Sequence, residues 1–243
     1  MRFYVLAFHL LIILLHPLRA AEFPEPHDME GQVRFLDEFL TQFKDSFQLH
    51  LVDSFEQELL YSPRANSTDL SDIRFLFKTP DKNAFEMEKN IIQKHIKKEI
   101  SFERSLFIHT SFNLSGQHFQ LLSHRPVALT GQLFRASLWV HSNHTYNTLS
   151  LLFNNAEGRE IEVNLGRMNW FGWRRIDVRL PASLYRRGRN FQTRYRHSFK
   201  GFVIRSPTGR DPENASILID HLLVLSNVKE LSYPGAEILD NWK

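Results

Sequence analysis

The first regular pattern in the chain is a run of apolar residues at three- and four-residue spacing. Between Asp28 and Gln48, the apolar positions with this spacing are Val33, Leu36, Phe39, Leu40, Phe43 and Phe47. This period is that of an amphipathic helix, so the segment 28–48 predicts one helix with a Phe-rich face. Because such a face is too apolar to remain in water, we expect it to pack on the rest of the chain or on another chain.

From Leu49 onwards the apolar positions mostly alternate with polar ones, which is the period of β-strands. Segments rich in turn-forming residues, such as 154–158, separate the alternating runs. The predicted strands cover residues 49–55, 72–78, 104–112, 117–122, 134–141, 147–154, 158–165, 174–180, 199–205 and 215–225. This many short strands predict a mainly β fold, an antiparallel jelly-roll-like β-sandwich.

One segment interrupts the strand pattern. Between residues 81 and 100, apolar side chains recur at helical spacing among many Lys and Glu residues. We interpret this segment as a helical insertion. The expected organisation is an N-terminal extension with its amphipathic helix over residues 21–48, a β-sandwich domain over 49–228 and a C-terminal tail over 229–243.

The first twenty residues are typical of an export signal. Met1 and Arg2 precede a nearly continuous apolar run from Phe3 to Leu15, which is shorter than the roughly 20 residues that span a bilayer. We therefore expect residues 1–20 to be a signal peptide cleaved after Ala20, or one residue later. The mature chain would then have no stable membrane insertion; an uncleaved N-terminal anchor is the alternative.

The amino-acid composition indicates in which cellular compartment the exported protein would reside. The 243 residues include no cysteine, which excludes a lipoprotein anchor, disulfides, thiolate metal sites and cysteine nucleophiles. An exported animal domain of this size would usually carry disulfides, so their absence favours a bacterial periplasm. The sequons at Asn66, Asn113, Asn143 and Asn214 argue weakly in the other direction, because sequons also arise by chance.

Basic residues are concentrated in one part of the chain. Between Arg167 and Arg210 there are twelve Lys or Arg residues and one acid, Asp177. Such a segregated charge can steer self-association or attract an acidic partner. The alternative is a solvated basic loop. Nucleic acid is not an expected partner, because the export signal argues against it.

The sequence contains few residues that suggest catalysis. The usual nucleophile, phosphate-binding, dinucleotide and zinc-protease motifs are absent. Asp53, Glu56 and Asp220 lie in or beside apolar strands, where buried carboxylates need hydrogen-bond donors or a cation. They are weak candidates for a structural Ca²⁺, and we expect no catalytic residue, no cofactor and no other metal.

The candidates for a partner interface are basic and aromatic side chains. They are Arg167, Trp170, Arg174, Arg175, Arg186, Arg187, Arg189, Arg194, Arg196, Phe39 and Phe43. Trp173, next to Gly172, is instead expected to be a buried residue that shapes the start of the strand 174–180. The cluster of Trp170, Phe171 and Trp173 beside arginines could also stack on sugar rings, although aromatic residues at strand ends more often fill a core.

Several colinear segments resemble one protein family. They are Arg125–Gly131, Ala136–Val140, Leu149–Phe153, Gly158, Leu165–Gly166, Trp170–Val178 with Pro181, Phe199–Arg205, Ile217–Val224 and, at the start, Val52–Glu56. In this order they are similar to the FlaA-type outer-layer (sheath) proteins of spirochete periplasmic flagella. The helix at 28–48, the insertion at 81–100 and the Arg-rich 186–196 segment depart from that pattern.

The resemblance implies a jelly-roll sandwich in the periplasm with no enzymatic activity. It also implies a sheath role in which the protein coats the flagellin core, contacts other sheath proteins and contributes to filament shape and motility. A periplasmic carbohydrate-binding module is the alternative function, and a glycosidase is a weaker third.

Overall fold

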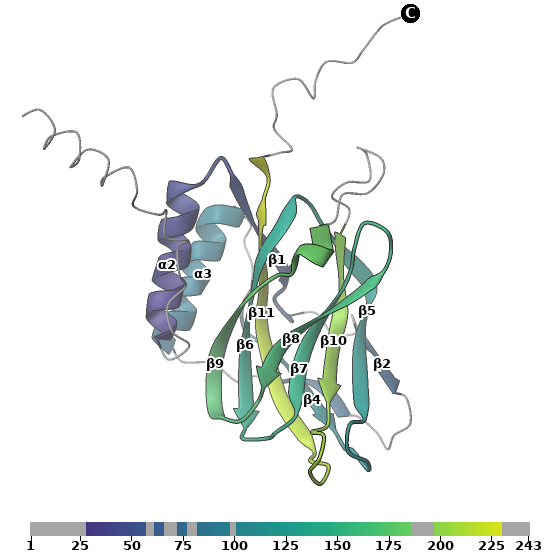
Figure 1. Ribbon diagram of the computed structural model, residues 1–243. Coiled ribbons are helices and arrows are strands. Elements are labelled where there is room, and N and C mark those ends of the chain that lie inside the picture. Colours follow the sequence, from purple (N-terminus) through teal and green to yellow (C-terminus); the bar gives the residue numbers. More distant parts are fainter. Residues whose placement is uncertain are drawn as a thin grey trace, which may run out of the picture.

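The computed structural model describes residues 28–56, 61–65, 72–76, 82–97, 101–185 and 197–229. Two antiparallel sheets pack face to face, and two helices cover the outer face of one sheet (Figure 1). The predicted mainly β fold with an N-terminal helix and a helical insertion is therefore confirmed. The expected signal peptide and the Arg-rich segment 186–196 lie outside the described residues. No helix in the described part of the chain is long and apolar enough to cross a membrane.

The larger sheet has its longest strand at the centre. Its strands are β1 (Phe47–Asp53), β3 (Asp72–Leu76), β4 (Ser105–Thr110), β6 (Gln132–Asn143), β9 (Phe171–Arg179) and β11 (Ala215–Asn227), in the order β3-β4-β11-β6-β9. One edge of β11 pairs with β6. The other edge pairs first with β4, from Ala215 to Ile219, and then with β1, from Leu222 to Asn227.

The smaller sheet lies across the core from the larger one. Its strands are β2 (Tyr61–Ala65), β5 (His118–Leu129), β7 (Thr148–Asn154), β8 (Glu160–Arg167) and β10 (His197–Arg205), in the order β2-β5-β10-β7-β8. A short 3-10 helix, η1 (Ala182–Tyr185), follows β9. Each of the ten predicted strands corresponds to an observed one. The sequence gives no sign of β2, because Pro63 and its polar neighbours break the alternation; proline is tolerated there because β2 is an edge strand.

Alternating apolar residues from both sheets form the main core. Its fully buried aromatic rings are Phe55, Phe119, Phe153, Phe199 and Phe202. The two sheets approach each other through these side chains, and within the smaller sheet β5 and β10 approach closely at Gly201. A Cβ atom at that glycine would lie 2.1 Å from the carbonyl oxygen of Leu121, so only glycine fits this bulge.

The two helices form a third layer. They are α2 (Met29–Gln42), whose N-terminus is capped by the Asp28 carboxylate accepting from the Gly31 amide at 2.8 Å, and α3 (Lys82–Ile96). Together with Trp139, Leu223 and Leu225 of the sheet, they enclose a second apolar core. The predicted Phe-rich face therefore packs within the chain.

The predicted helix boundary at Gln48 was wrong. The helix ends at Gln42, and β1 begins at Phe47, which pairs with Asn227 of β11. The helical spacing of aromatic residues continues past the helix because Phe43 and Phe47 both contact Phe39, with ring centroids 4.9 and 4.8 Å away. The same apolar cluster is thus reached from a helix, a turn and a strand.

Candidate assembly surface

Arg175, one of the predicted interface residues, is buried inside the protein. Its side chain is 1% exposed and lies between α3 and the larger sheet. Its Nε donates to Glu88 Oε1 at 2.8 Å and its Nη2 to Ser137 Oγ at 3.0 Å, while Nη1 donates to Asp177. The predicted interface role of Arg175 is therefore wrong for the folded chain: it attaches α3 to the sheet.

Glu88 is the centre of this buried polar cluster. It is fully buried and also accepts from Trp139 Nε1, while His221 Nδ1 lies 3.1 Å from Oε2. Burial by itself would raise the pKa of the Glu88 carboxyl, but the Arg175 charge and the contacts with His221 outweigh it, so the pKa lies below its usual value. Glu88 is thus a buried carboxylate with a paired cation.

A β-bulge in β11 brings His221 into the cluster. The pairing with β6 shifts between Asp220 and Leu223, and His221 has a φ of +40°. His221 stacks on Phe85 of α3 with ring centroids 4.2 Å apart. A bulge places two successive side chains on one face of a sheet, which here is the face covered by the helices.

The three weak calcium candidates bind hydrogen-bond donors of the chain itself. Asp53 accepts from the Phe55 amide and the Tyr61 hydroxyl, Glu56 from the amides of residues 103 and 104, and Asp220 from Ser105 Oγ and the His221 amide. Within the described ranges, no group of three or more His, Asp or Glu side chains is placed to hold a metal ion. Their geometry is that of structural hydrogen-bond acceptors.

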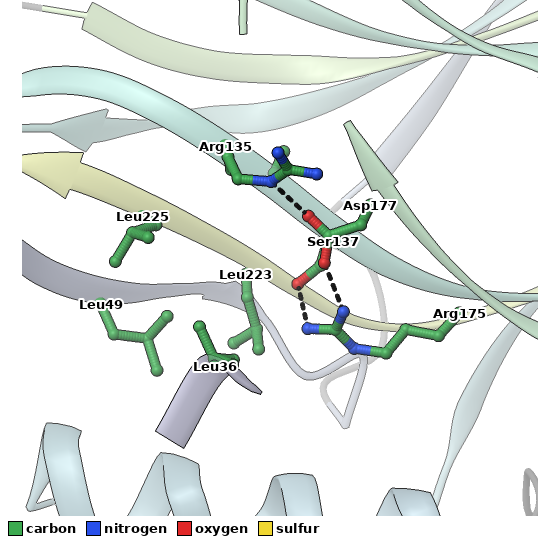
Figure 2. A pocket seen from close by; sticks show the side chains of 9 residues that line it. Leu36, Leu49, Arg135, Ser137, Arg175, Asp177, Leu223 and Leu225 are labelled. Carbon is green, nitrogen blue, oxygen red and sulfur yellow. Dashed lines mark hydrogen bonds and ion pairs between the residues drawn. The ribbon is translucent and has the colours of Figure 1, made fainter. Parts of the chain in front are cut away.

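Below α2, the polar cluster continues to Arg135. Figure 2 shows Arg135 and Arg175 on either side of Asp177, with Leu36, Leu49, Leu223 and Leu225 facing them across a small cavity. Arg135 Nε donates to Asp177 Oδ1 at 2.8 Å. The cavity has a volume of about 10 Å³, which is room for roughly one water molecule. This region is therefore the polar part of the contact between the helices and the larger sheet, and it has no space for an organic ligand.

Two of the predicted candidates, Arg167 and Arg174, lie at one end of the sandwich. The connections β4–β5, β6–β7, β8–β9 and β10–β11 all lie at this end (Figure 1). Hydrogen bonds from backbone amides join them: the His144 amide donates to the Trp170 carbonyl oxygen at 2.8 Å, and the Tyr146 amide donates to the side-chain Oε2 of Glu213 at 2.8 Å. The loops are therefore held in one arrangement by several bonds between segments far apart in sequence.

Aromatic and basic side chains lie on these loops and on the adjoining ends of β8 and β9. We call the group the loop-end surface; it consists of His144, Tyr146, Arg167, Phe171, Arg174 and Arg210. Phe171 is 76% exposed and stacks on His144, with ring centroids 5.0 Å apart. The Arg210 guanidinium lies 4.0 Å from the Tyr146 ring centroid, and that of Arg174 lies 4.8 Å from the Trp170 ring centroid.

The structure thus brings together only some of the predicted interface residues. Arg167 and Arg174 belong to the loop-end surface, and Trp170 lies beneath it, 9% exposed. Phe39 is buried in the helical layer, so its predicted interface role is wrong for the folded chain, whereas Phe43 remains 39% exposed. The candidates Arg186, Arg187, Arg189, Arg194 and Arg196 lie outside the described residues.

Three members of this surface were not among the predicted interface residues. His144, Tyr146 and Arg210 come from two separate connections, and only the topology of the sheets brings them near Phe171. Phe171 was considered only as a residue that could stack on sugar rings; it is the first residue of β9 and directly precedes Gly172, whose φ is +83°. The expected burial of Trp173 is met only in part: it is half-buried against the helical layer.

The fold and the surface together define a β-sandwich protein with an aromatic and basic loop end. The family model described as "Flagellar filament outer layer protein Flaa" matches residues 64–234, and the chain belongs to this family.

A curated relative from Brachyspira hyodysenteriae (strain ATCC 49526 / WA1) is described as a putative flagellar filament outer layer-like protein. It is 24% identical over 125 residues, which are 51% of this chain and 58% of the relative, so the match spans little more than half of that protein.

Two solved structures were found to be similar to this chain. The family 11 carbohydrate-binding module from Clostridium thermocellum, in complex with a β-1,3-1,4-mixed-linked tetrasaccharide, is 7% identical with a TM-score of 0.40 and covers 74% of this chain and 96% of its own. The enzymatically active domain of bacteriophage CBA120 tailspike protein 4 is 14% identical with a TM-score of 0.40, over 72% of this chain and 20% of its own.

Proposed function

We propose that this protein is an exported, non-catalytic subunit of the sheath on periplasmic flagellar filaments. In this role it coats the flagellin core, contacts neighbouring sheath subunits and contributes to filament shape and motility. Membership of the outer-layer family over residues 64–234 is the observation that carries the proposal. The three-layer body supplies a rigid unit, because α3 is attached to the sheet by a buried ion pair.

The loop-end surface is the proposed contact with the filament. Arginine and aromatic side chains dominate the energetics of protein interfaces, since they combine large contact areas with directional hydrogen bonds. Phe171 exposes most of its ring, yet it is held in place by His144 and by the start of β9. A preordered anchor of this kind loses little conformational entropy on binding.

The proposal is tested by cosedimenting the purified chain with isolated filament cores. We expect binding that weakens in Phe171→Ser and in Arg167→Ser/Arg210→Ser. The matched control is Arg125→Ser/Arg159→Ser, which removes two exposed arginines away from the loop end. Equal binding by the loop-end variants and the control would show that this surface is not the contact.

A second measurement distinguishes the sheath subunit from the alternative function, a carbohydrate-binding module. The exposed Phe171 ring could stack on a pyranose ring, as aromatic rings do in sugar sites. A lectin would bind soluble glycans as an isolated chain, whereas a sheath subunit would bind little until filaments or partner subunits are added. Calorimetric titration with soluble glycans therefore distinguishes the two.

A further inference from the structure

A groove opens where both helices end. It lies between the C-terminal ends of α2 and α3, the beginning of β1 and the residue that follows β11, and its volume is about 600 Å³. In Figure 1 this is the side of the molecule where β1 begins and β11 ends. The residues that line it are Leu40, Thr41, Lys44, Phe47, Gln48, Leu49, Lys94, His95, Lys97 and Val228.

The groove combines an apolar floor with a basic rim. Leu40 and Leu49 are buried members of the helical core, and Phe47 and Val228 are half-buried beside them. On the rim, Lys94 and His95 both bind Asp37. Lys44 and Lys97 are exposed and form no ion pair with any residue that the structure describes. The matching ligand is therefore a peptide that carries both apolar and acidic side chains within a short stretch.

We propose that the occupant is the segment 230–243 of the same chain. The described chain leaves the sheet at Val228, which itself lines the groove, and continues into Glu230-Leu-Ser-Tyr-Pro-Gly-Ala-Glu-Ile-Leu-Asp-Asn-Trp-Lys243. This segment has three acids and one lysine. Ile238 and Leu239 lie between Glu237 and Asp240, and Trp242 follows two positions later, so apolar side chains for the floor and carboxylates for the rim come from one short stretch.

The spacing along the segment allows it to return to the groove. Pro234-Gly235 is a strong turn signal, because proline fixes φ at the first central position and glycine accepts the positive φ of the second. A turn there leaves four residues, 230–233, leading away and four, 236–239, leading back. Each arm can span about 13 Å when extended, so the chain length is sufficient for Glu237 to Asp240 to reach the neighbourhood of Val228.

Paired cysteines test this docking in the full chain, which has no cysteine of its own. Gln48→Cys, on the rim of the groove, is combined with Asn241→Cys, which leaves the acidic and apolar residues of the segment intact. The control pair is Arg159→Cys with Asn241→Cys, on the smaller sheet. Disulfide formation under mild oxidation is followed by gel mobility over a range of protein concentrations.

We expect the groove pair to form an intramolecular disulfide at least about tenfold faster than the control pair, because a docked segment raises the local concentration. The rate should be independent of protein concentration. It should fall in Lys44→Glu/Lys97→Glu and recover when Glu237→Lys/Asp240→Lys is added. Circular dichroism and melting temperature check that each variant is folded.

Three outcomes would overturn the proposal. Equal rates for the groove and control pairs would show that the segment does not dock. An unchanged rate in the Lys44→Glu/Lys97→Glu variant would show that the basic rim does not recognise it. Disulfide-linked dimers that increase with concentration would assign the groove to a second copy of the chain. Docking within one chain requires no filament, so its failure and the failure of the proposed sheath role are distinguishable.

Discussion

Glu88 fixes the position of α3 on the larger sheet, because its buried carboxylate is ionised and must be paired with Arg175. An ionised carboxylate removed from water is destabilising by several kcal/mol unless donors surround it. Glu88 receives those donors from residues 51, 87 and 133 positions away in the sequence. Within the Lys/Glu-rich insertion it has the local pattern of a solvated helix face, and sequence alone could not separate it from its exposed neighbour Glu86. The partners of a buried charge are a property of the tertiary structure.

Replacing Glu88 by Gln should strongly destabilise the protein. The substitution keeps the shape but removes one of the two charge partners of the buried Arg175 guanidinium, leaving Asp177, which it shares with Arg135. We expect a loss of about 3–5 kcal/mol in the free energy of unfolding. The control is Glu86→Gln on the same helix, whose side chain is exposed and should change stability by about 0.5 kcal/mol or less. Urea denaturation of both variants measures the difference. Similar midpoints would contradict a structural role for the cluster.

Asp220 should make stability depend on pH. Burial raises its pKa from 3.8 to about 7, against the opposing effect of His221, whose ring and amide face it, and of the Ser105 hydroxyl; Glu56 adds to the increase. Because the folded state holds this proton up to a higher pH than the unfolded state, the stabilisation is fully present below about pH 4 and is lost as pH rises through about 7. The slope from this group is at most about 1.4 kcal/mol per pH unit.

Asp220→Asn removes this titration while keeping an oxygen that can accept from the His221 amide. We expect the free energy of unfolding of the variant, relative to that of the wild type, to rise between pH 4 and pH 8. Denaturant titrations at several pH values measure it. A constant difference across that range would show that burial does not raise the pKa of Asp220 in the folded protein.

At the scale of elements, the strands other than β2 were predictable from sequence, and their irregularities were not. Ten strands follow from period-two alternation, because each strand faces a core on at least one side. The bulge at Asp220 and His221 is invisible to that pattern, since both residues can occupy a strand and only the pairing with β6 shows the extra residue. The end of α2 was predicted wrongly for a related reason. Phe43 and Phe47 contact Phe39 from outside the helix, so the helical spacing of apolar residues continues beyond the last helical residue, Gln42.

The helical layer should depend on Phe39 far more than on Phe43. Phe39 is buried and contacts the rings of Phe35, Phe43, Phe47 and Phe134. Phe39→Ala should therefore cost about 3–5 kcal/mol. Phe43→Ala is the matched control, because the same substitution on a ring that is 39% exposed leaves a smaller cavity. Thermal unfolding followed by circular dichroism compares them, and equal losses would mean that the aromatic cluster does not hold α2 on the sheet.

At the scale of the whole molecule, the candidate surface was only partly accessible to sequence reasoning. Arg167, Trp170 and Arg174 are close in sequence, so a local cluster of basic and aromatic residues revealed them. His144, Tyr146 and Arg210 join them only because antiparallel strands place four connections at one end. The buried Arg175 has the same local context as its exposed neighbours, and its assignment depends on which face of β9 meets α3.

The basic stretch Arg167–Arg210 therefore contains two groups of arginines, those of the loop-end surface and those of the segment 186–196. Their contributions to filament binding can be measured separately. Arg186, Arg187 and Arg189 surround Gly188 in a stretch without strand periodicity. Changing all three to Ser should alter the free energy of unfolding by about 0.5 kcal/mol or less, so the melting temperature should be nearly unchanged. If this segment contributes to assembly, the triple variant should bind filament cores more weakly than wild type at low salt. Added salt should then reduce the difference, because exposed ion pairs are screened beyond roughly 10 Å at 0.1 M. Cosedimentation of wild type, the triple variant and Arg167→Ser/Arg210→Ser across a salt series measures both contributions. Equal binding by the triple variant and wild type at low salt would leave the loop-end surface as the basic contact and would make the segment 186–196 a solvated loop.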